Sequence, residues 1–321
     1  MRFAVIDLGT NTVRLLIADA DGPDGYRPVR SAQKTTRLGQ GLGPTRELQP
    51  EPVARTLRVV GAFGALAETE GAEHLLVVGT SALREAKNRA MFQARARDEF
   101  GVEVSVVSGE TEARLSLLGV RAALPHLAAR FMMMDIGGGS TEFVRAENNR
   151  VRAAVSTGLG VVKLTEGFLH TDPPTPGEIL GAREAVTARL VSARDKVLAG
   201  VGPAEPLVGT AGTVTTLAAM DLALERYDPA RVTGHTLSCT RVAEILQACA
   251  AVPLAQRKTF IGLESARADV IIAGMIICIG VMETFGVPVL TVSDGGLREG
   301  ILLDWLARFF SSPRTTGPAS A

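Results

Sequence analysis

One short pattern occurs twice in this chain: an apolar run that ends in aspartate, a turn of glycine and threonine, and a second apolar run. It reads "FAVIDLGTNTVRLLIADAD" from Phe3 to Asp21 and "FMMMDIGGGSTEFVRAEN" from Phe131 to Asn148. Short apolar runs joined by a glycine-rich turn are typical of paired β-strands. A chain that carries this pattern twice is expected to fold as two related halves.

A second pair of landmarks repeats at nearly the same distance. Asp7 and Asp135 lie 128 residues apart, and Gly79 and Gly209 lie 130 residues apart. The two glycines belong to "LLVVGTSALR" and "PLVGTAGTVTTLA", each a short apolar run that leads into Gly-Thr. Matching offsets at two landmarks indicate an internal duplication.

Each half predicts a three-stranded meander followed by a crossover helix and further α/β units. The expected elements are strands at 2–7, 12–20 and 26–36 with a helix at 50–70, then strands at 130–135, 141–147 and 150–157 with a helix at 176–199. Such an order predicts two mixed sheets covered by helices, an α/β fold. Pro125 follows a helical stretch, so we place the first domain at 1–125 and the second at 126–298. The small polar segment 311–321 is expected to be disordered.

Composition excludes several classes of protein. Lys plus Arg and Asp plus Glu both number 34, so no net charge attracts the chain to nucleic acid or to a membrane surface. Cys239, Cys249 and Cys278 lack the CxxC spacing of zinc sites and are expected to be reduced, buried thiols.

The apolar run at 3–6 is too short for a signal peptide, which predicts a cytoplasmic protein. The apolar run at 270–282 is too short to span a bilayer and predicts a buried helix.

The glycine- and threonine-rich turns have the composition of phosphate-binding sites. Consecutive backbone N–H groups and hydroxyls there can bind anionic oxygens, and glycine lets the anion approach closely. Any one turn could instead contain glycine only because a hairpin needs it. Four turns related by duplication favour a shared phosphate site: "DLGTNT", "GTSALR", "DIGGGST" and "GTAGTVTT". The last turn contributes the candidates Gly209, Thr210, Gly212 and Thr213, and it lacks the lysine of a P-loop.

Three carboxylates accompany these turns. Asp7 and Asp135 end their strands at a turn, and Glu142 follows the second one. Beside a phosphate they would be repulsive unless a hard cation such as Mg²⁺ lay between them. The alternative is that each aspartate only caps its own turn.

Other candidates lie outside the turns. "SGETEARL" predicts a helix that Ser108 caps, on which periodicity places Glu112 toward packed structure and Glu110 toward solvent. Dipole complementarity alone would also explain both glutamates. Arg84 follows the Gly79 turn and could bind a phosphate through two N–H groups. We interpret His235 as structural.

Six ordered motifs carry a resemblance to a known family: "DLGTNTVRLLI", "GTSALREAKN", "SGETEARL", "MDIGGGSTEFV", "GTAGTVTTLA" and "SDGGLREGIL". Together they resemble the exopolyphosphatase and guanosine pentaphosphate phosphohydrolase family, within the actin, sugar kinase and Hsp70 superfold. The resemblance implies two actin-like (ribonuclease H-like) domains with a cleft between them. It also implies that the last helix, at about 299–310, packs back on the first domain.

The resemblance further implies hydrolysis of a terminal phosphoanhydride with Mg²⁺ or Mn²⁺, and K⁺ as a monovalent cation. By position, the family's catalytic glutamate falls on Glu112 and its metal-associated carboxylates on Asp135 and Glu142. Its phosphate-binding elements fall on Asn11, Arg84, Gly137, Gly138, Gly139, Ser140 and Thr141. A homodimer is a further expectation that rests on the family alone.

Polyphosphate is the substrate we expect, and three other functions stay open. Guanosine pentaphosphate ends in a short phosphoanhydride chain that the same motifs would accept. A kinase or ATPase of the superfold could use "GTAGTVTTLA" to hold a nucleotide, although an activated water at Glu112 would compete with transfer. A non-catalytic sensor of phosphate chains would not need Glu112, Asp135 and Glu142 together.

Overall fold

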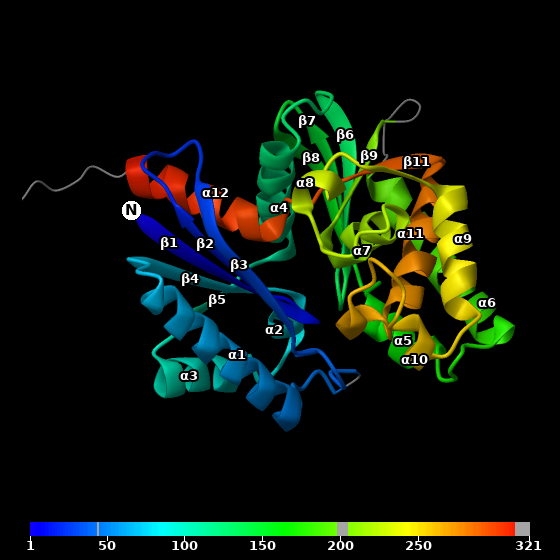
Figure 1. Cartoon of the computed structure of the whole chain (residues 1–321), viewed down its shortest axis with the longest axis horizontal. Helices are drawn as coiled ribbons and strands as arrows, with labels where there is room; N and C mark the ends of the chain where they lie inside the picture. The colour runs from blue at the N-terminus through cyan, green and yellow to red at the C-terminus, as the bar shows by residue number, and fades with distance from the viewer. Residues whose placement is uncertain (44, 198–204, 312–321) are drawn as a thin grey trace, which may run out of the picture.

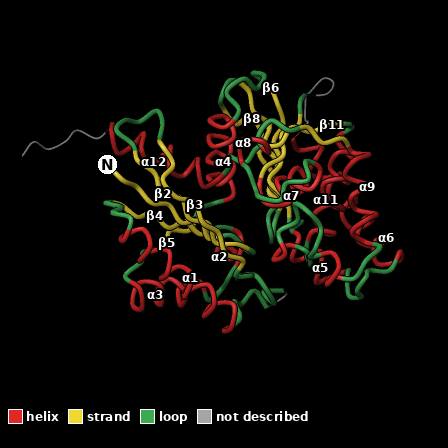
Figure 2. The backbone as a smooth tube through the Cα atoms, viewed as in Figure 1, coloured by secondary structure: helices red, strands yellow, loops and turns green. Residues whose placement is uncertain are grey.

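The protein folds into two mixed β-sheets, each covered by helices. The computed structural model describes residues 1–43, 45–197 and 205–311. Figure 1 shows the two sheets in separate halves of the molecule, and Figure 2 shows that helices surround both. Residues 312–321 of the predicted tail and residues 198–199 of the predicted long helix lie outside the described residues.

The first sheet has the strand order β3-β2-β1-β4-β5. Its first three strands form an antiparallel meander, and β4 and β5 add in parallel to β1. The elements of this half are β1 (Arg2–Leu8), β2 (Thr12–Asp19), β3 (Arg27–Thr35), α1 (Pro50–Thr69), β4 (His74–Gly79), α2 (Ser81–Glu85), α3 (Arg89–Phe100) and β5 (Val104–Val106). Helix α4 (Gly109–Ala123) then leads to the second sheet.

The second sheet has the strand order β10-β11-β9-β6-β7-β8. A meander again comes first, and β9 and β11 add in parallel. Its elements are β6 (Arg130–Ile136), β7 (Thr141–Glu147), β8 (Arg150–Thr157), α5 (Val161–Phe168), α6 (Pro176–Val197), β9 (Leu207–Thr210), α7 (Ala211–Asp221), α8 (Pro229–Val232), β10 (Thr236–Ser238), α9 (Cys239–Ala250), α10 (Leu254–Arg257), the 3₁₀ turn η1 (Ser265–Arg267), α11 (Ile271–Phe285) and β11 (Val289–Val292). Helix α12 (Leu297–Ser311) ends the described chain.

The two sheets repeat one arrangement, which confirms the predicted duplication. Both place a meander, a central first strand and two parallel strands in the same order, and β10 is an extra edge strand. In the first hairpin Asp7 pairs in register with Arg14, and in the second Asp135 pairs with Glu142. Residues 14 and 142 are therefore equivalent positions of the two halves.

The strands are apolar on both sides because helices cover both faces of each sheet. On β1, Ala4, Ile6 and Leu8 belong to the core beneath α1 and α3. Phe3 and Val5 face the opposite way and pack against α12. The continuous apolar run that opens the chain follows from this arrangement, since alternate residues enter different cores.

Helices α4 and α12 pack so closely that their backbones touch. A Cβ atom on Gly119 of α4 would lie 1.9 Å from the carbonyl oxygen of Gly296, and one on Gly300 of α12 would lie 1.7 Å from the carbonyl oxygen of Leu115. Leu115 packs with α12 and the first sheet, whereas Val120 packs against the second sheet. Helix α4 therefore contributes to the cores of both halves.

The predicted buried helix at 270–282 is confirmed, because every residue of α11 from Ile271 to Met282 is buried. Among the described residues, no helix is both long enough and apolar enough to cross a membrane. All three cysteines are free thiols. The prediction that all are buried is wrong for Cys239, which is only half-buried because it begins α9 near the surface.

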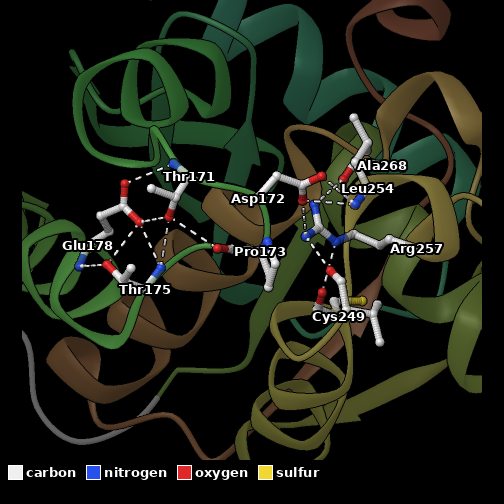
Figure 3. Close-up of polar contacts among 10 residues, drawn as sticks. Thr171, Asp172, Pro173, Thr175, Glu178, Cys249, Leu254, Arg257 and Ala268 are labelled. Atoms are coloured by element: carbon white, nitrogen blue, oxygen red, sulfur yellow. Dashed lines mark hydrogen bonds and ion pairs between the residues drawn. The ribbon is translucent and has the colours of Figure 1, made fainter.

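Arg257 ties together several segments of the second half (Figure 3). Its buried guanidinium donates to the carbonyl oxygens of Cys249 at 2.8 Å and of Ala268 at 3.1 Å, and it lies 3.5 Å from the carboxylate of Asp172. The same carboxylate accepts the N–H of Leu254 at 2.8 Å. A charged group buried in this way is satisfied by carbonyls, and it holds the segment that includes η1 in place.

The α4 and α12 contact predicts that Gly300→Ala destabilises the fold by at least about 3 kcal/mol, because the methyl group would overlap backbone rather than a movable side chain. Urea unfolding measures the change. Gly167→Ala is the matched control, since nothing lies within 4 Å of a Cβ there and the position is helical. It should change stability by less than about 1 kcal/mol. Equal unfolding midpoints for Gly300→Ala and wild type would contradict the packing described.

Candidate active site

A cavity of about 90 Å³ lies where the turns of the two halves meet. The predicted site residues that line it come from both sheets and from α4. They are Asp7, Asn11, Glu112, Asp135, Gly137, Gly138, Gly139, Ser140, Glu142, Thr210, Gly212 and Thr213. The structure therefore brings together residues more than 200 positions apart in the sequence, as the duplication predicts.

The glycines of "DIGGGST" are required by the approach of the opposite half. A Cβ atom on Gly138 would lie 3.0 Å from Asn11 and Thr10, and one on Gly139 would lie 2.9 Å from the hydroxyls of Thr10 and Ser81. Any side chain at either position would push the two turns apart. The turns face each other across the cavity and present backbone groups and hydroxyls to it, which suits an oxyanion.

Two buried aspartates lie at the strand ends beside the turns. Burial raises the pKa of Asp7 to about 6 and that of Asp135 to about 7, and the charge on Arg14 lowers both pKa values in part. Asp7 Oδ1 and Asn11 Oδ1 are buried without a hydrogen-bond partner. Unpartnered oxygens in a buried acidic cavity are what a hard cation such as Mg²⁺ would satisfy.

Glu112 is positioned by the first turn of α4. Ser108 caps this helix by accepting the N–H of Thr111 at 3.1 Å, and Glu112 is buried whereas Glu110 is exposed, both as predicted. Burial raises the pKa of Glu112 well above its usual range, the nearby Glu142 raises it further, and Arg84 lowers it. Glu142 in turn accepts the hydroxyl of Ser156 at 2.7 Å.

Arg84 does not line the cavity as a free phosphate clamp. Its Nη1 donates to Glu112 Oε2 at 2.6 Å and to the carbonyl oxygen of Val107 at 3.2 Å. The prediction missed this pair because Arg84 and Glu112 lie 28 residues apart and meet only through the fold. The guanidinium therefore fixes the orientation of Glu112 in this structure.

Two further predicted phosphate ligands lie outside the cavity lining. The hydroxyl of Thr141 is buried and donates to the carbonyl oxygen of Leu159 at 2.7 Å. Gly209 lies within β9, where its carbonyl oxygen accepts the N–H of Ser293 at 2.9 Å. Both residues shape the turns, and their own polar groups are used by the protein.

Sequence reasoning missed two arginines that line the cavity. Arg14 extends from β2 and Arg267 from η1. The guanidinium of Arg267 fills the space where Gly212 lacks a side chain, since a Cβ there would lie 1.8 Å from its Nη1. Arg14 could have been found from the repeat, because it is the equivalent of Glu142. No motif marked Arg267.

His235 has a structural partner, as interpreted from the sequence. Its Nε2 lies 2.7 Å from Asp221 Oδ2, and Arg241 Nε lies 2.6 Å from the other oxygen of the same carboxylate. None of these three residues lines the cavity.

The two sheets have the arrangement of an actin-like, two-domain fold, and turns from both halves meet at the cavity. A sequence profile described as the Ppx/GppA phosphatase family matches residues 16–309. The chain belongs to this family.

Named relatives cover nearly the whole chain. Exopolyphosphatase 2 of Mycobacterium tuberculosis is 36% identical over 314 residues, which are 94% of this chain and 98% of that protein. Exopolyphosphatase 1 of Mycobacterium leprae is 29% identical over 94% of this chain and 89% of its own. A solved Aquifex aeolicus member of the Ppx/GppA family has a TM-score of 0.79 and 34% identity, covering 97% of this chain and 99% of that one. A solved exopolyphosphatase from Cytophaga hutchinsonii has a TM-score of 0.85 and 28% identity, covering 95% and 98%.

The raised pKa of Asp135 predicts a pH-dependent stability. Between the ordinary pKa of 3.8 and the folded pKa of about 7, the folded protein binds more protons than the unfolded chain, so stability falls as pH rises through this window. Asp135→Asn removes the ionisation. In metal-free buffer it should therefore be more stable than wild type by about 2 kcal/mol or more at pH 8, and equal to it near pH 4.

Melting temperatures at the two pH values measure this difference. Asp24→Asn, in an exposed loop, is the control and should follow wild type at both. If Asp135→Asn loses stability with rising pH as steeply as wild type does, the buried carboxyl is not the cause.

Proposed function

We propose that this protein is an exopolyphosphatase, which hydrolyses the terminal phosphoanhydride of inorganic polyphosphate and releases orthophosphate. The observation that carries the proposal is Glu112, buried beside a cavity that glycine-rich turns from both halves enclose and oriented there by Arg84. The named relatives support the substrate, since Exopolyphosphatase 2 of Mycobacterium tuberculosis matches 94% of this chain.

Glu112 is the group placed to activate water. Its carboxylate accepts a proton from a water molecule as the water oxygen attacks the terminal phosphorus. The bond from that phosphorus to the bridging oxygen breaks, and the shortened chain keeps the electron pair. Arg84 holds the carboxylate in position and, by lowering its pKa, favours the ionised form that this step needs. Backbone N–H groups and hydroxyls of the turns stabilise charge on the phosphoryl oxygens.

Asp7, Asp135 and Glu142 are the residues that would hold Mg²⁺ or Mn²⁺. The carboxylate oxygens of these residues are the type of ligand that Mg²⁺ prefers, and Asp7 Oδ1 has no hydrogen-bond partner. Among the residues that the structure describes, no three acidic, histidine or cysteine side chains lie close enough together to form a metal site, so the three carboxylates would not all be direct ligands at once. This suits a cation whose remaining ligands are water and phosphate oxygens. Bound there, it would neutralise charge on the substrate. A role for K⁺ stays a prediction.

Guanosine pentaphosphate is the alternative substrate, and the exopolyphosphatase relatives favour polyphosphate over it. Phosphate release from both substrates, measured on one preparation, decides between them. Preference for the nucleotide would overturn the proposal.

Glu112→Gln should lower turnover on polyphosphate on the order of 100-fold or more, because the amide cannot accept the proton. Substrate affinity should be largely kept. Steady-state phosphate release and equilibrium binding measure the two effects. Glu103→Gln, at an exposed glutamate that does not line the cavity, is the matched control and should retain normal turnover. Near-normal turnover in Glu112→Gln would remove Glu112 from this role.

Mg²⁺ should raise the melting temperature of wild type more at pH 8 than at pH 5, because Asp7 and Asp135 are protonated at the lower pH. Asp135→Asn should lose most of this stabilisation. Differential scanning calorimetry with and without Mg²⁺ measures it without reference to activity. Full stabilisation of Asp135→Asn by Mg²⁺ would place the metal elsewhere.

A further inference from the structure

A second hollow of about 800 Å³ lies beside the cavity, between α4 and β8. We call it the α4/β8 groove. One wall is the face of α4 from Gly109 to Arg121, and the other is β8 from Arg150 to Ser156. Figure 1 shows α4 beside the strands of the second sheet, and β8 is an edge strand of that sheet. Arg152 and Ala154 are exposed, so the groove opens to solvent.

The groove and the cavity meet at Glu142, which is the residue that their two linings share. Its Oε1 accepts the hydroxyl of Ser156, which lies in the groove, at 2.7 Å. Gly109, the first residue of α4, borders the same point, and a Cβ there would lie 3.6 Å from the Cβ of Ser156. A movement of Glu142 away from Ser156 would join the two spaces.

The cavity has two different ends. Glu142 lines the groove as well as the cavity, and Glu112 of the adjoining helix α4 accepts a hydrogen bond from Arg84 at 2.6 Å. Arg14 and Arg267 line the cavity but not the groove, and the guanidinium of Arg267 lies against Gly212. The equivalence of Arg14 and Glu142 in the two halves explains this separation, since the duplication places them on opposite sides of the shared site.

The orientation of the bound phosphate chain follows from these two ends of the cavity. Attacking and leaving oxygens lie roughly in line at the phosphorus. With the water at Glu112, the remaining chain must point away from it, toward Arg14 and Arg267. The released orthophosphate then lies between Glu112 and the shortened chain, so the substrate blocks one route out of the cavity. The α4/β8 groove opens on the other side.

The charges of the groove suit an anion in transit. Four arginines line it, Arg114, Arg121, Arg150 and Arg152, against two carboxylates, Glu110 and Glu142. Arg114 is paired with Asp304 at 2.7 Å and Arg152 with Glu147 at 2.7 Å, so neither presents a bare charge that would hold phosphate tightly. Among the described residues, Arg150 has no ion-pair partner. Positive walls attract the anion, and partial neutralisation lets it leave.

We propose that the α4/β8 groove is the exit path for orthophosphate, and that it allows the product to leave while the shortened chain stays bound in the cavity. This inference rests on the proposed hydrolysis of polyphosphate. It assigns Glu142 and Ser156, whose contact closes the inner end of the groove, a gating role in addition to any role in binding.

The test is to obstruct the groove at a residue outside the catalytic machinery. Ala154 is exposed and lies two residues from Ser156 on the same face of β8, so the ring of Ala154→Phe would occupy the inner end of the groove. Ala154→Ser is the matched control. Arg152→Glu is a second variant, which reverses a charge on the wall without filling the groove. Melting temperatures confirm that each variant folds.

Two rates are compared with polyphosphate as substrate. Rapid quenching measures cleavage in a single turnover, and a fluorescent phosphate-binding protein measures release. In Ala154→Phe, release should slow about tenfold while cleavage is unchanged, and Arg152→Glu should slow release more weakly. Ala154→Ser should match wild type in both.

Three outcomes would overturn the inference. Unchanged release in Ala154→Phe would show that phosphate leaves by another route. A higher KM for long chains with normal release would show that the groove holds substrate instead. If wild type itself frees no orthophosphate from polyphosphate, the proposed function fails, and the exit path fails with it.

Discussion

The burial of four carboxylates in one cavity is the constraint on which the rest of this structure depends. Asp7, Glu112, Asp135 and Glu142 lie close enough to raise one another's pKa values or share partners, and burial raises all four. Such a group is unfavourable unless charges of opposite sign enter the same space. The fold brings Arg14 and Arg267 into the cavity and bonds Arg84 to Glu112, while Asp7 Oδ1 and Asn11 Oδ1 have no hydrogen-bond partner. The site is thus suited to occupants that offset its charge.

Duplication gives this site both its symmetry and its direction. Each half contributes one aspartate at a strand end and two turns, which encloses the cavity from both sides. The residue opposite the aspartate then differs, Arg14 in one half and Glu142 in the other. Because this one position carries opposite charges in the two halves, the otherwise symmetric site has an acidic side and a basic side. In the proposed reaction, this asymmetry would let a phosphate chain bind in one productive orientation.

The sequence was sufficient to predict the fold, since both sheets, their meanders and the repeat follow from local apolar runs and fixed offsets. Glu112 could also be predicted, because helical periodicity placed it on the buried side of α4. Side-chain pairs between distant segments could not be predicted from the sequence. Arg84 was predicted to contact phosphate but is bonded to Glu112, and Arg267 carried no motif. Thr141 shows a different limit, because a hydroxyl next to a phosphate-binding turn can point into the protein.

The glycine contact between α4 and α12 has a mechanical consequence. The described chain passes between the halves twice, through α4 on the way out and before α12 on the way back, and the two helices touch at Gly119 and Gly300. Because the backbones of α4 and α12 are in direct contact, the two helices resist sliding past each other and separating. Rotation about the point where they cross remains possible. The crossing of α4 and α12 is therefore suited to act as a hinge. A small rotation of one half about it would move the residues farthest from the hinge by the largest distance.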